Sequence, residues 1–195
     1  MSLSDIVRID PSFFPLTAER WPDLEALFGP RGACGGCWCM VWRLPHRVWE
    51  AGKAGANREA FHALVAADHQ PGVLAYHGER AVGWCAIAPR SEYPSLARSR
   101  ILKPVDDQPV WSVSCLFVAR AYRRHGLSAA LLTAAVEFAA ERGATIVEGY
   151  PVEPRSPDQP PPFVWTGVAS AYLQAGFTEV ARNSPTRPIM RRMMC

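Results

Sequence analysis

One segment, Cys115 to Val136 (CLFVARAYRRHGLSAALLTAAV), joins an apolar strand to a basic loop that contains a glycine and then to a helix. Leu116 and Val118 alternate as they do on one face of a strand, and apolar residues recur at helical spacing from Leu127 to Ala140. The first N–H groups of a helix have no partner within it, and the helix dipole is positive at that end, so anions bind there. The segment therefore predicts a phosphate-binding site where the strand turns into the helix, at Gly126.

The loop between this strand and this helix has the order Arg123-x-x-Gly126-x-Ser128. The order resembles the acyl-CoA loop of the GCN5-related N-acetyltransferase (GNAT) superfamily, which is usually written Gln/Arg-x-x-Gly-x-Gly/Ala. Ser128 departs from that pattern, but serine is small enough for a pyrophosphate to lie close, and its hydroxyl can donate to it. Taken alone, the loop also fits a glycine that only turns a strand into a helix, with its arginines in solvent.

A second motif, ASAYLQAGFTEV from Ala169 to Val180, resembles the last helix and strand of the same superfamily. There a tyrosine lies four residues before a Gly-Phe pair, and here these residues are Tyr172, Gly176 and Phe177. Gly176 suits the end of a helix, where the left-handed conformation is common. The superfamily often has a cofactor-contacting Asn seven residues before the tyrosine, where this chain has Trp165.

Coarse secondary-structure signals give the order β-α-α-β-β-β-α-β-α-β-β. Strands are expected at Ile6 to Ile9, in a hairpin within VLAYHGERAVGWCAIA, at Gln108 to Val118, at Ala144 to Glu148, from Phe177 onwards and in the terminal PIMRRMM. This order predicts an α/β fold, and the resemblance implies a GNAT-like mixed, mostly antiparallel sheet flanked by helices. It also implies that the two parallel central strands splay apart to admit the pantetheine arm of the cofactor. Residues 1–195 are expected to form a single domain.

The resemblance implies that acetyl-CoA is the co-substrate. It places this cofactor against ten residues of the strand, the loop and the start of the helix: Leu116, Phe117, Val118, Arg123, Arg124, His125, Gly126, Leu127, Ser128 and Ala129. The backbone N–H groups of residues 116–118 are suited to polarising the thioester carbonyl, because a fixed dipole needs no reorganisation as negative charge develops.

Acyl transfer to an amine also needs an acid for the departing thiolate and a route for the proton of the amine. In related enzymes the tyrosine of the second motif lies near the thioester sulfur, which makes Tyr172 the expected acid. A tyrosine packed in the core is the alternative for that position. The expected base is Glu148, at the end of its strand, with Glu153, Asp106, Asp107 or a water relay as alternatives.

Three cysteines lie close together in Cys34-Gly-Gly-Cys37-Trp-Cys39. With a histidine or Cys195 as fourth ligand they fit a zinc site, although no second pair at zinc-finger spacing exists. They also fit a redox pair, but without the strand-before-helix setting of such pairs. Small thiols packed beside neighbouring tryptophans, with no metal, are the expected arrangement. This segment and the later YPVEPR resemble an uncharacterised bacterial branch of the superfamily.

Tryptophans in loops are the expected walls of an acceptor pocket. Trp38 and Trp165 lie in segments rich in glycine or proline, where binding residues often occur. Core packing is the alternative for both of these side chains. The basic residues of ARSRILKPVDD either attract a carboxylate or phosphate on the acceptor or belong to a solvated loop.

Composition limits the classes of protein that remain. A hydrophobic fraction of 49% over 195 residues suffices for a normal core and excludes a disordered chain. A net charge of +3, without a basic stripe that carries aromatic residues, argues against a nucleic-acid partner. No signal peptide and no apolar run of membrane-spanning length is evident, so a cytoplasmic protein with reduced cysteines and no membrane partner is expected.

The sequence thus predicts an acetyl-CoA-dependent N-acyltransferase, as a monomer or a homodimer, whose acceptor is a primary amine of a small molecule or peptide. The alternative is a catalytically inactive member of the same fold that senses acyl-CoA or regulates a partner. A third interpretation makes the cysteine cluster a structural metal site beneath a surface for protein interaction.

Overall fold

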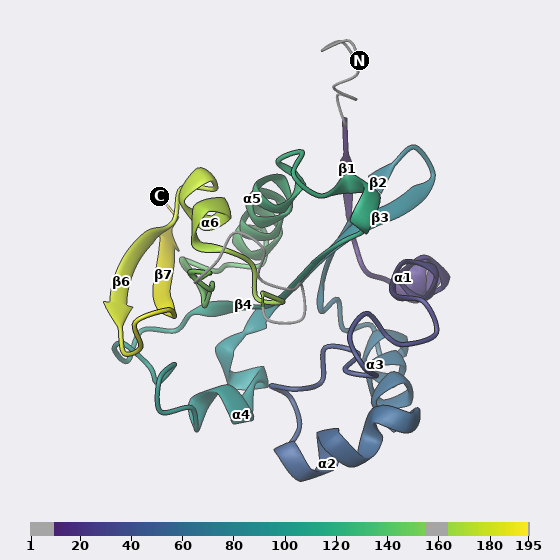
Figure 1. Ribbon diagram of the computed structural model, residues 1–195, viewed down its shortest axis with the longest axis horizontal. Helices are drawn as coiled ribbons and strands as arrows, with labels where there is room; N and C mark the ends of the chain where they lie inside the picture. The colour runs from purple at the N-terminus through teal and green to yellow at the C-terminus, as the bar shows by residue number, and fades with distance from the viewer. Residues whose placement is uncertain (1–9, 155–163, 195) are drawn as a thin grey trace.

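The computed structural model describes residues 10–154 and 164–194 of the chain. Its strands are β1 (Ser12–Pro15), β2 (Gly72–His77), β3 (Arg80–Pro89), β4 (Trp111–Val118), β5 (Ile146–Gly149), β6 (Thr178–Arg182) and β7 (Pro188–Met193). They form a seven-stranded sheet in the order β1-β2-β3-β4-β5-β7-β6 (Figure 1). Neighbouring strands are antiparallel except β4 and β5, which are parallel, and this confirms the predicted fold class. The strand expected at Ile6 to Ile9 lies outside the described residues.

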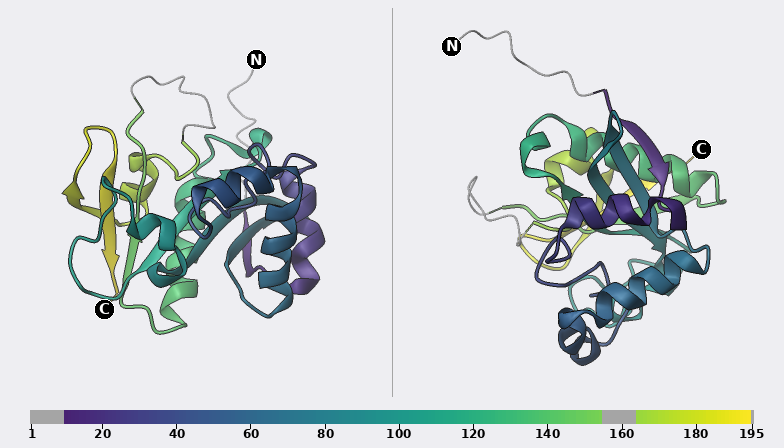
Figure 2. Two further views of the ribbon diagram at one scale, coloured as in Figure 1. Left: turned by 90° about the horizontal axis from the view of Figure 1, so that it is seen from below. Right: turned by 90° about the vertical axis from the view of Figure 1, so that its right-hand side faces the viewer.

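Helices cover both faces of this sheet. They are α1 (Trp21–Phe28), α2 (His46–Ala51), α3 (Ala56–Ala66), α4 (Pro94–Ala97), α5 (Leu127–Ala140) and α6 (Ala169–Gln174). Short 3-10 helices lie at Ala18–Arg20, Gly52–Ala54, Arg90–Glu92 and Arg120–Tyr122. Helices α5 and α6 pack on one face of the sheet, and α1 and α3 pack on the other (Figures 1 and 2). Within the described ranges, no helix combines the length and the hydropathy that a membrane span requires.

Helix α5 has the bounds that its hydrophobic periodicity predicts, Leu127–Ala140. Its apolar side chains, among them Leu131 and Ala135, are fully buried against the sheet. Gly126 precedes it with φ +78° and Gly143 follows it with φ +80°, a conformation that costs other residues strain. A local pattern of spacing and glycines therefore predicts the bounds of this helix, and packing on the sheet stabilises it.

The two parallel strands part at the middle of the sheet. Strands β4 and β5 pair only from Trp111 to Val113, after which β4 continues to Val118 without β5 beside it. On its other side, β4 carries an extra residue, Ser114, because Ala86 and the next residue of β3 face Cys115 and Val113. Such a bulge bends a strand locally. The predicted divergence of the central strands is confirmed.

Successive side chains of β4 pack on opposite faces of the sheet. Leu116 and Val118 lie in the core beneath α5, whereas Cys115 and Phe117 pack towards α1 and the loop of residues 29–45. Any group that enters between the parted strands therefore has different walls on the two faces of the sheet.

Candidate active site

The start of α5 offers backbone N–H groups to an anion. The first N–H groups of the helix that find a carbonyl are those of Ala129 and Ala130, and both bond to the oxygen of Gly126. No side chain caps the helix, and the N–H groups of Leu127 and Ser128 have no partner among the described residues. The helix start therefore has unpaired donors at the positive end of its dipole, as an anion site requires.

The basic residues before this helix have different surroundings. Arg123 donates from Nε to the carbonyl oxygen of Val118 at 2.9 Å, which ties the loop to the end of β4. Arg124 and His125 are exposed, and Arg124 has a left-handed backbone with φ +67°. Both exposed side chains are free to face a ligand at the helix start.

The side chains of the other expected cofactor residues lie in different surroundings. Leu116, Val118 and Leu127 bury their side chains in the core beneath α5. Phe117 points to the opposite face, where its ring lies 5.5 Å from that of Phe28. Ser128 and Ala129 are half-buried in the first turn of α5.

Part of the gap between the parted strands is bridged by the chain itself. The N–H of Leu116 donates to the carbonyl oxygen of Trp165 at 2.8 Å. The N–H of Val152 donates to the carbonyl of Gly167 at 2.9 Å, and Val152 and Val168 form an isolated parallel bridge. Residues 164–168 therefore act as a short substitute strand between β4 and the segment that follows β5. The N–H expected to polarise a thioester already has a partner in this conformation.

Tyr172 lies fully buried beside this bridging segment. Its hydroxyl donates to the carbonyl oxygen of Thr166 at 3.0 Å. Side chains at Gly149 or Gly167 would overlap its ring, so both glycines make room for it. Burial raises the pKa of Tyr172 well above its ordinary value, which keeps the hydroxyl protonated at neutral pH.

Glu148, the expected base, is fully buried and engaged on both carboxylate oxygens. Oε1 accepts hydrogen bonds from Arg90 at 2.8 Å and from the hydroxyl of Tyr150 at 2.7 Å. Oε2 accepts from Nε of Arg191 at 2.8 Å, and Arg191 also binds the carboxylate of Asp106. Donors from three residues thus occupy both oxygens of this carboxylate. The geometry therefore favours a structural role for Glu148 over proton transfer.

The other carboxylates proposed for that role lie elsewhere. Glu153 binds Arg182 through both of its oxygens, at 2.6 and 2.7 Å. The hydrogen bonds from Arg191 hold the pKa of Asp106 below its usual value. Asp107 is exposed on the loop before β4.

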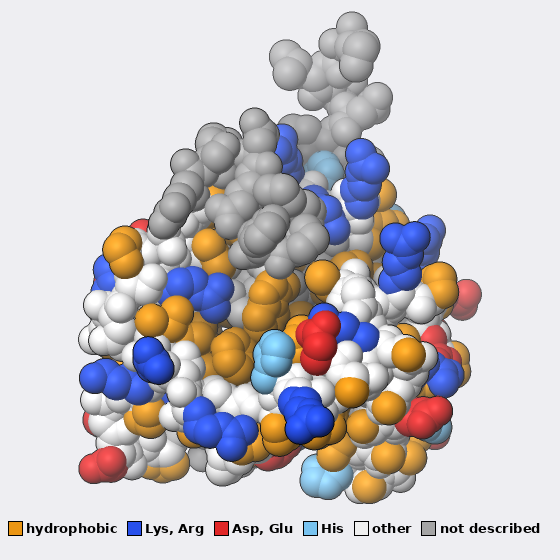
Figure 3. Space-filling model, turned by 60° about the horizontal axis from the view of Figure 1, so that its bottom comes forward, with side chains coloured by type: hydrophobic (Ala, Val, Ile, Leu, Met, Phe, Trp, Pro, Cys, Tyr) orange, Lys and Arg blue, Asp and Glu red, His pale blue; other side chains and the backbone are white. Residues whose placement is uncertain are grey.

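A cavity of about 260 Å³ lies on the face of β4 towards which Cys115 points. Its walls include Cys37, Cys39, Val41, Trp49, Cys115 and Trp165, and Lys53 also lines it. No aspartate or glutamate is among its described lining residues. Figure 3 shows apolar side chains in the hollowed centre of the face that carries α2 and α4, with lysine and arginine side chains around it.

Asn57 holds one wall of this cavity in place, a role that sequence reasoning missed. Its buried amide nitrogen donates to the carbonyl oxygens of Gly36 and Trp49, each at 2.9 Å. An asparagine near the start of a helix indicates a cap, and no local signal shows that it binds two distant carbonyls.

The two tryptophans expected to line an acceptor pocket lie in different places. Trp165 is half-buried and lines the cavity, with its ring 5.8 Å from that of Trp42. Trp38 lies in the core, only 5% exposed and stacked on Trp21 at 5.8 Å. Trp38 therefore stabilises the loop from behind and does not face the cavity.

The cysteine loop shows no metal geometry in the described part of the chain. No three side chains of histidine, cysteine, aspartate or glutamate are placed to hold an ion there. Cys195, considered as a fourth zinc ligand, lies outside the described residues.

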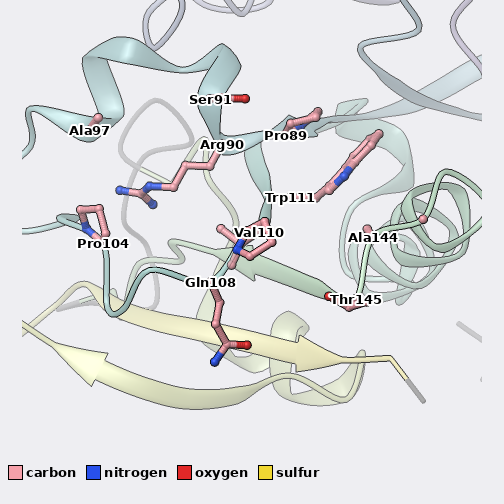
Figure 4. A pocket seen from close by; sticks show the side chains of 12 residues that line it. Pro89, Arg90, Ser91, Ala97, Pro104, Gln108, Val110, Trp111, Ala144 and Thr145 are labelled. Carbon is pink, nitrogen blue, oxygen red and sulfur yellow. The ribbon is translucent and has the colours of Figure 1, made fainter.

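A second cavity of about 400 Å³ lies at the start of β4. Arg90, Pro104, Gln108, Trp111 and Thr145 line it, as the close-up in Figure 4 shows. Trp111 begins β4, so residues 112–114 of the strand lie between this cavity wall and Cys115. The guanidinium of Arg90 is already bound to Glu148 and to the Leu102 carbonyl.

The chain is similar to known proteins in its sequence pattern and in its fold. The model of the acetyltransferase (GNAT) family matches residues 38–154. The structure of the PaiA N-acetyltransferase from Thermoplasma acidophilum with coenzyme A has a TM-score of 0.51 and 12% identity, over 94% of this chain and 99% of that chain. No curated protein sequence matches the chain.

Two further structures are similar in fold. An agmatine N-acetyltransferase mutant in its apo form has a TM-score of 0.56 and 10% identity, over 95% of this chain and 100% of that chain. The polyamine N-acetyltransferase of Drosophila melanogaster has a TM-score of 0.55 and 10% identity, over the same shares of the two chains. At these identities the likeness concerns the fold alone.

Proposed function

The chain belongs to the GNAT family of acetyltransferases, and on this premise we propose that it transfers an acetyl group from acetyl-CoA to a primary amine of a small molecule or peptide. One observation carries the proposal: unpaired N–H groups at the start of α5 lie beside the end of β4, which has parted from β5. The first feature suits a pyrophosphate, and the second suits an extended arm with amide groups.

In the proposed complex, the pyrophosphate of acetyl-CoA accepts from the N–H groups of Leu127 and Ser128. Arg124 and His125 are exposed beside this position and add positive charge or hydrogen-bond donors. A β-carbon at Gly126 would meet nothing within 4 Å, so space does not require a glycine there. The requirement comes from its left-handed backbone conformation.

The pantetheine arm follows β4 from Val118 towards Leu116 in this complex. The thioester carbonyl then takes the hydrogen bond that the Leu116 N–H now gives to Trp165. An N–H held by a strand stabilises the negative charge that develops on the carbonyl oxygen. Acetyl-CoA binding therefore requires that the segment around Trp165 withdraw from β4.

The amine approaches from the opposite face, through the cavity beside Cys115. Its nitrogen attacks the carbonyl carbon, the bond from carbon to sulfur breaks, and coenzyme A leaves as a thiolate. The amine attacks in its neutral form. Because the cavity has no carboxylate among its described lining residues, the proton that the amine loses is transferred to water.

Tyr172 is the proposed acid for the departing thiolate. Its hydroxyl is protonated at neutral pH and lies next to the bridging segment, where it now donates to Thr166. Once the bridging segment withdraws, the Tyr172 hydroxyl can donate its proton to the thiolate sulfur. Glu148 joins β5 to β7 through Arg191 and to the segment after β3 through Arg90, and it takes no part in this transfer.

One observation favours the alternative, an inactive protein that senses acyl-CoA: the N–H of Leu116 is already satisfied by Trp165. Calorimetry with acetyl-CoA, followed by a free-thiol assay over a panel of amines, separates the two functions. Binding with turnover supports the enzyme, and binding without turnover of any amine supports the sensor. Absence of binding contradicts both.

A further inference from the structure

Thiols from two distant parts of the chain meet in one cavity. Cys34, Cys37 and Cys39 come from the loop of residues 29–45, and Cys115 comes from β4. All four are free thiols in the structure. The proposed acetyl transfer uses none of them, so their convergence calls for a separate explanation.

The backbone aims Cys39 at β4. Trp38 has φ +46° and Cys39 has φ +57°, so two successive residues with side chains adopt the left-handed conformation. Strain of this kind persists only where the surroundings enforce it, and it clusters at functional sites. The indole N–H of Trp84 donates to the sulfur of Cys39 at 3.3 Å, which fixes the thiol in place.

The two innermost thiols differ in acidity. A hydrogen bond from Cys115, then the indole of Trp84 and the charge of Arg43, lower the pKa of Cys39 against the effect of burial. The same contact, together with burial, raises the pKa of Cys115 well above its ordinary value. Burial also raises the pKa of Cys37 to about 11. Cys39 is therefore the more acidic of the two thiols, and Cys115 is the one that keeps its proton more strongly.

We propose that Cys39 and Cys115 are a peroxide-reactive pair that forms a reversible disulfide across the cavity. The Cys39 thiolate attacks one oxygen of the peroxide, the O–O bond breaks, and a sulfenic acid forms while the other oxygen leaves as a hydroxide or alkoxide and takes up a proton. Cys115 then gives up its proton and attacks the Cys39 sulfur, and water leaves. The two thiols are oxidised together, and the peroxide is reduced to water, or to an alcohol and water.

The cavity selects a small, uncharged oxidant. Its volume is about 260 Å³, its walls are largely apolar, and Cys39 itself is only 6% exposed. Hydrogen peroxide or a small alkyl hydroperoxide fits these limits, whereas a bulky charged disulfide such as oxidised glutathione does not. The exposed Cys34 at the cavity wall is open to either reagent and is the less selective thiol.

The disulfide would also control acetyl transfer, a consequence that rests on the proposed function. Cys115 directly precedes Leu116, and it shares the cavity with Trp165. A covalent link from the loop to β4 fills the space through which the amine approaches. Oxidation is therefore expected to lower turnover at least tenfold while leaving acetyl-CoA affinity within about twofold, because α5 lies on the other face of the sheet.

Peptide mass spectrometry of the full chain tests the pair directly. The protein is treated with hydrogen peroxide, its free thiols are alkylated, and the peptides are mapped before and after reduction. The expected product is a linked peptide that contains Cys39 and Cys115, lighter by two hydrogen atoms and lost on reduction. A map in which Cys39 stays alkylated, or in which only Cys34 and Cys37 are linked, overturns the proposal.

Three variants sharpen the test. Cys115→Ser should stop the reaction at the sulfenic acid, which a dimedone adduct on Cys39 reports. Cys39→Ser should leave Cys115 reduced, and the control Cys34→Ser should keep the linked peptide. If Cys115 is linked to another cysteine in the Cys39→Ser protein as fully as it is linked in the wild type, the assignment of Cys39 is overturned. If a variant fails to fold, the wild-type map still decides.

The two proposals fail in distinguishable ways. The linked peptide is read without any acetyl acceptor, so it forms even if the protein transfers no acetyl group. A protein that forms the link and has no turnover contradicts the proposed function alone. An active protein without the link contradicts the thiol pair alone.

Discussion

The N–H of Leu116 donates a 2.8 Å hydrogen bond to the carbonyl oxygen of Trp165. This contact joins the strand that parts from β5 to a segment that lies between the two. A buried N–H without a partner is costly, so the chain satisfies this donor itself when no ligand lies in the gap. Ligand and protein then compete for one donor, and that competition determines how the site opens.

Acetyl-CoA should change amide exchange in an asymmetric way. The Leu116 amide stays protected, because a thioester carbonyl replaces that of Trp165. The amides of Val152 and Ala169, which bond across the bridging segment, lose protection as the segment withdraws. Hydrogen exchange with and without acetyl-CoA measures this directly. Protection of Val152 and Ala169 that stays the same or rises on binding would show that the bridge remains closed.

Gly126→Ala should weaken acetyl-CoA binding about tenfold, because the strained left-handed residue shifts the N–H groups that hold the pyrophosphate. Gly143→Ala is the matched control. It has nearly the same φ, and a β-carbon there also meets open space, but it lies at the other end of α5. Both variants should lose about 1 kcal/mol of stability. Equal affinities by calorimetry would remove the pyrophosphate from this helix start.

Tyr172→Phe should lower kcat by about a hundredfold or more, because the acid for the thiolate is lost, with acetyl-CoA affinity nearly unchanged. It should also cost about 1 kcal/mol of stability, because the Thr166 carbonyl loses its donor. Tyr150→Phe is the control, since it removes an equally buried hydroxyl that bonds to Glu148. Steady-state kinetics decide, and equal losses in both variants would reduce Tyr172 to a packing role.

Local signals predicted the parts of the site that depend on neighbours in sequence. The bounds of α5 and its unpaired start follow from apolar spacing and the position of Gly126. The parallel pair β4 and β5 follows from the order strand, helix, strand. Glu148 could not be assigned in this way, because its character comes from Arg90 and Arg191, far away in the chain. A carboxylate at a strand end has the same local pattern whether it faces solvent or two guanidinium groups.

The cysteine loop shows the same limit. Its spacing leaves metal, redox and packing roles open, since the partner that distinguishes Cys39 is Cys115 on β4. The contact depends on left-handed residues with side chains, which no propensity predicts. The burial of Trp38 behind that loop is likewise a result of packing on Trp21.

Glu148→Gln should destabilise the fold by about 3 to 5 kcal/mol, because two buried guanidinium groups lose the charge that compensates them. If Glu148 only positions β5 and β7, the variant that still folds at low temperature retains the pH profile of kcat. Chemical denaturation and pH-dependent kinetics check the two parts. Loss of one limb of that profile would restore Glu148 as a proton acceptor.

Substitutions of Trp165 and Trp38, for which the sequence predicts the same role, should have different effects on amine binding and on stability. Trp165→Ala opens the cavity wall, so the KM for the amine should rise about tenfold or more, while stability changes little because the side chain is only half-buried. Trp38→Ala removes a core ring stacked on Trp21 and should cost about 3 to 5 kcal/mol, with KM unchanged in protein that remains folded. Thermal unfolding and kinetics on both variants test the contrast. A rise in KM for Trp38→Ala equal to that for Trp165→Ala would mean that the cavity is shaped by the whole loop and that Trp165 does not bind the acceptor.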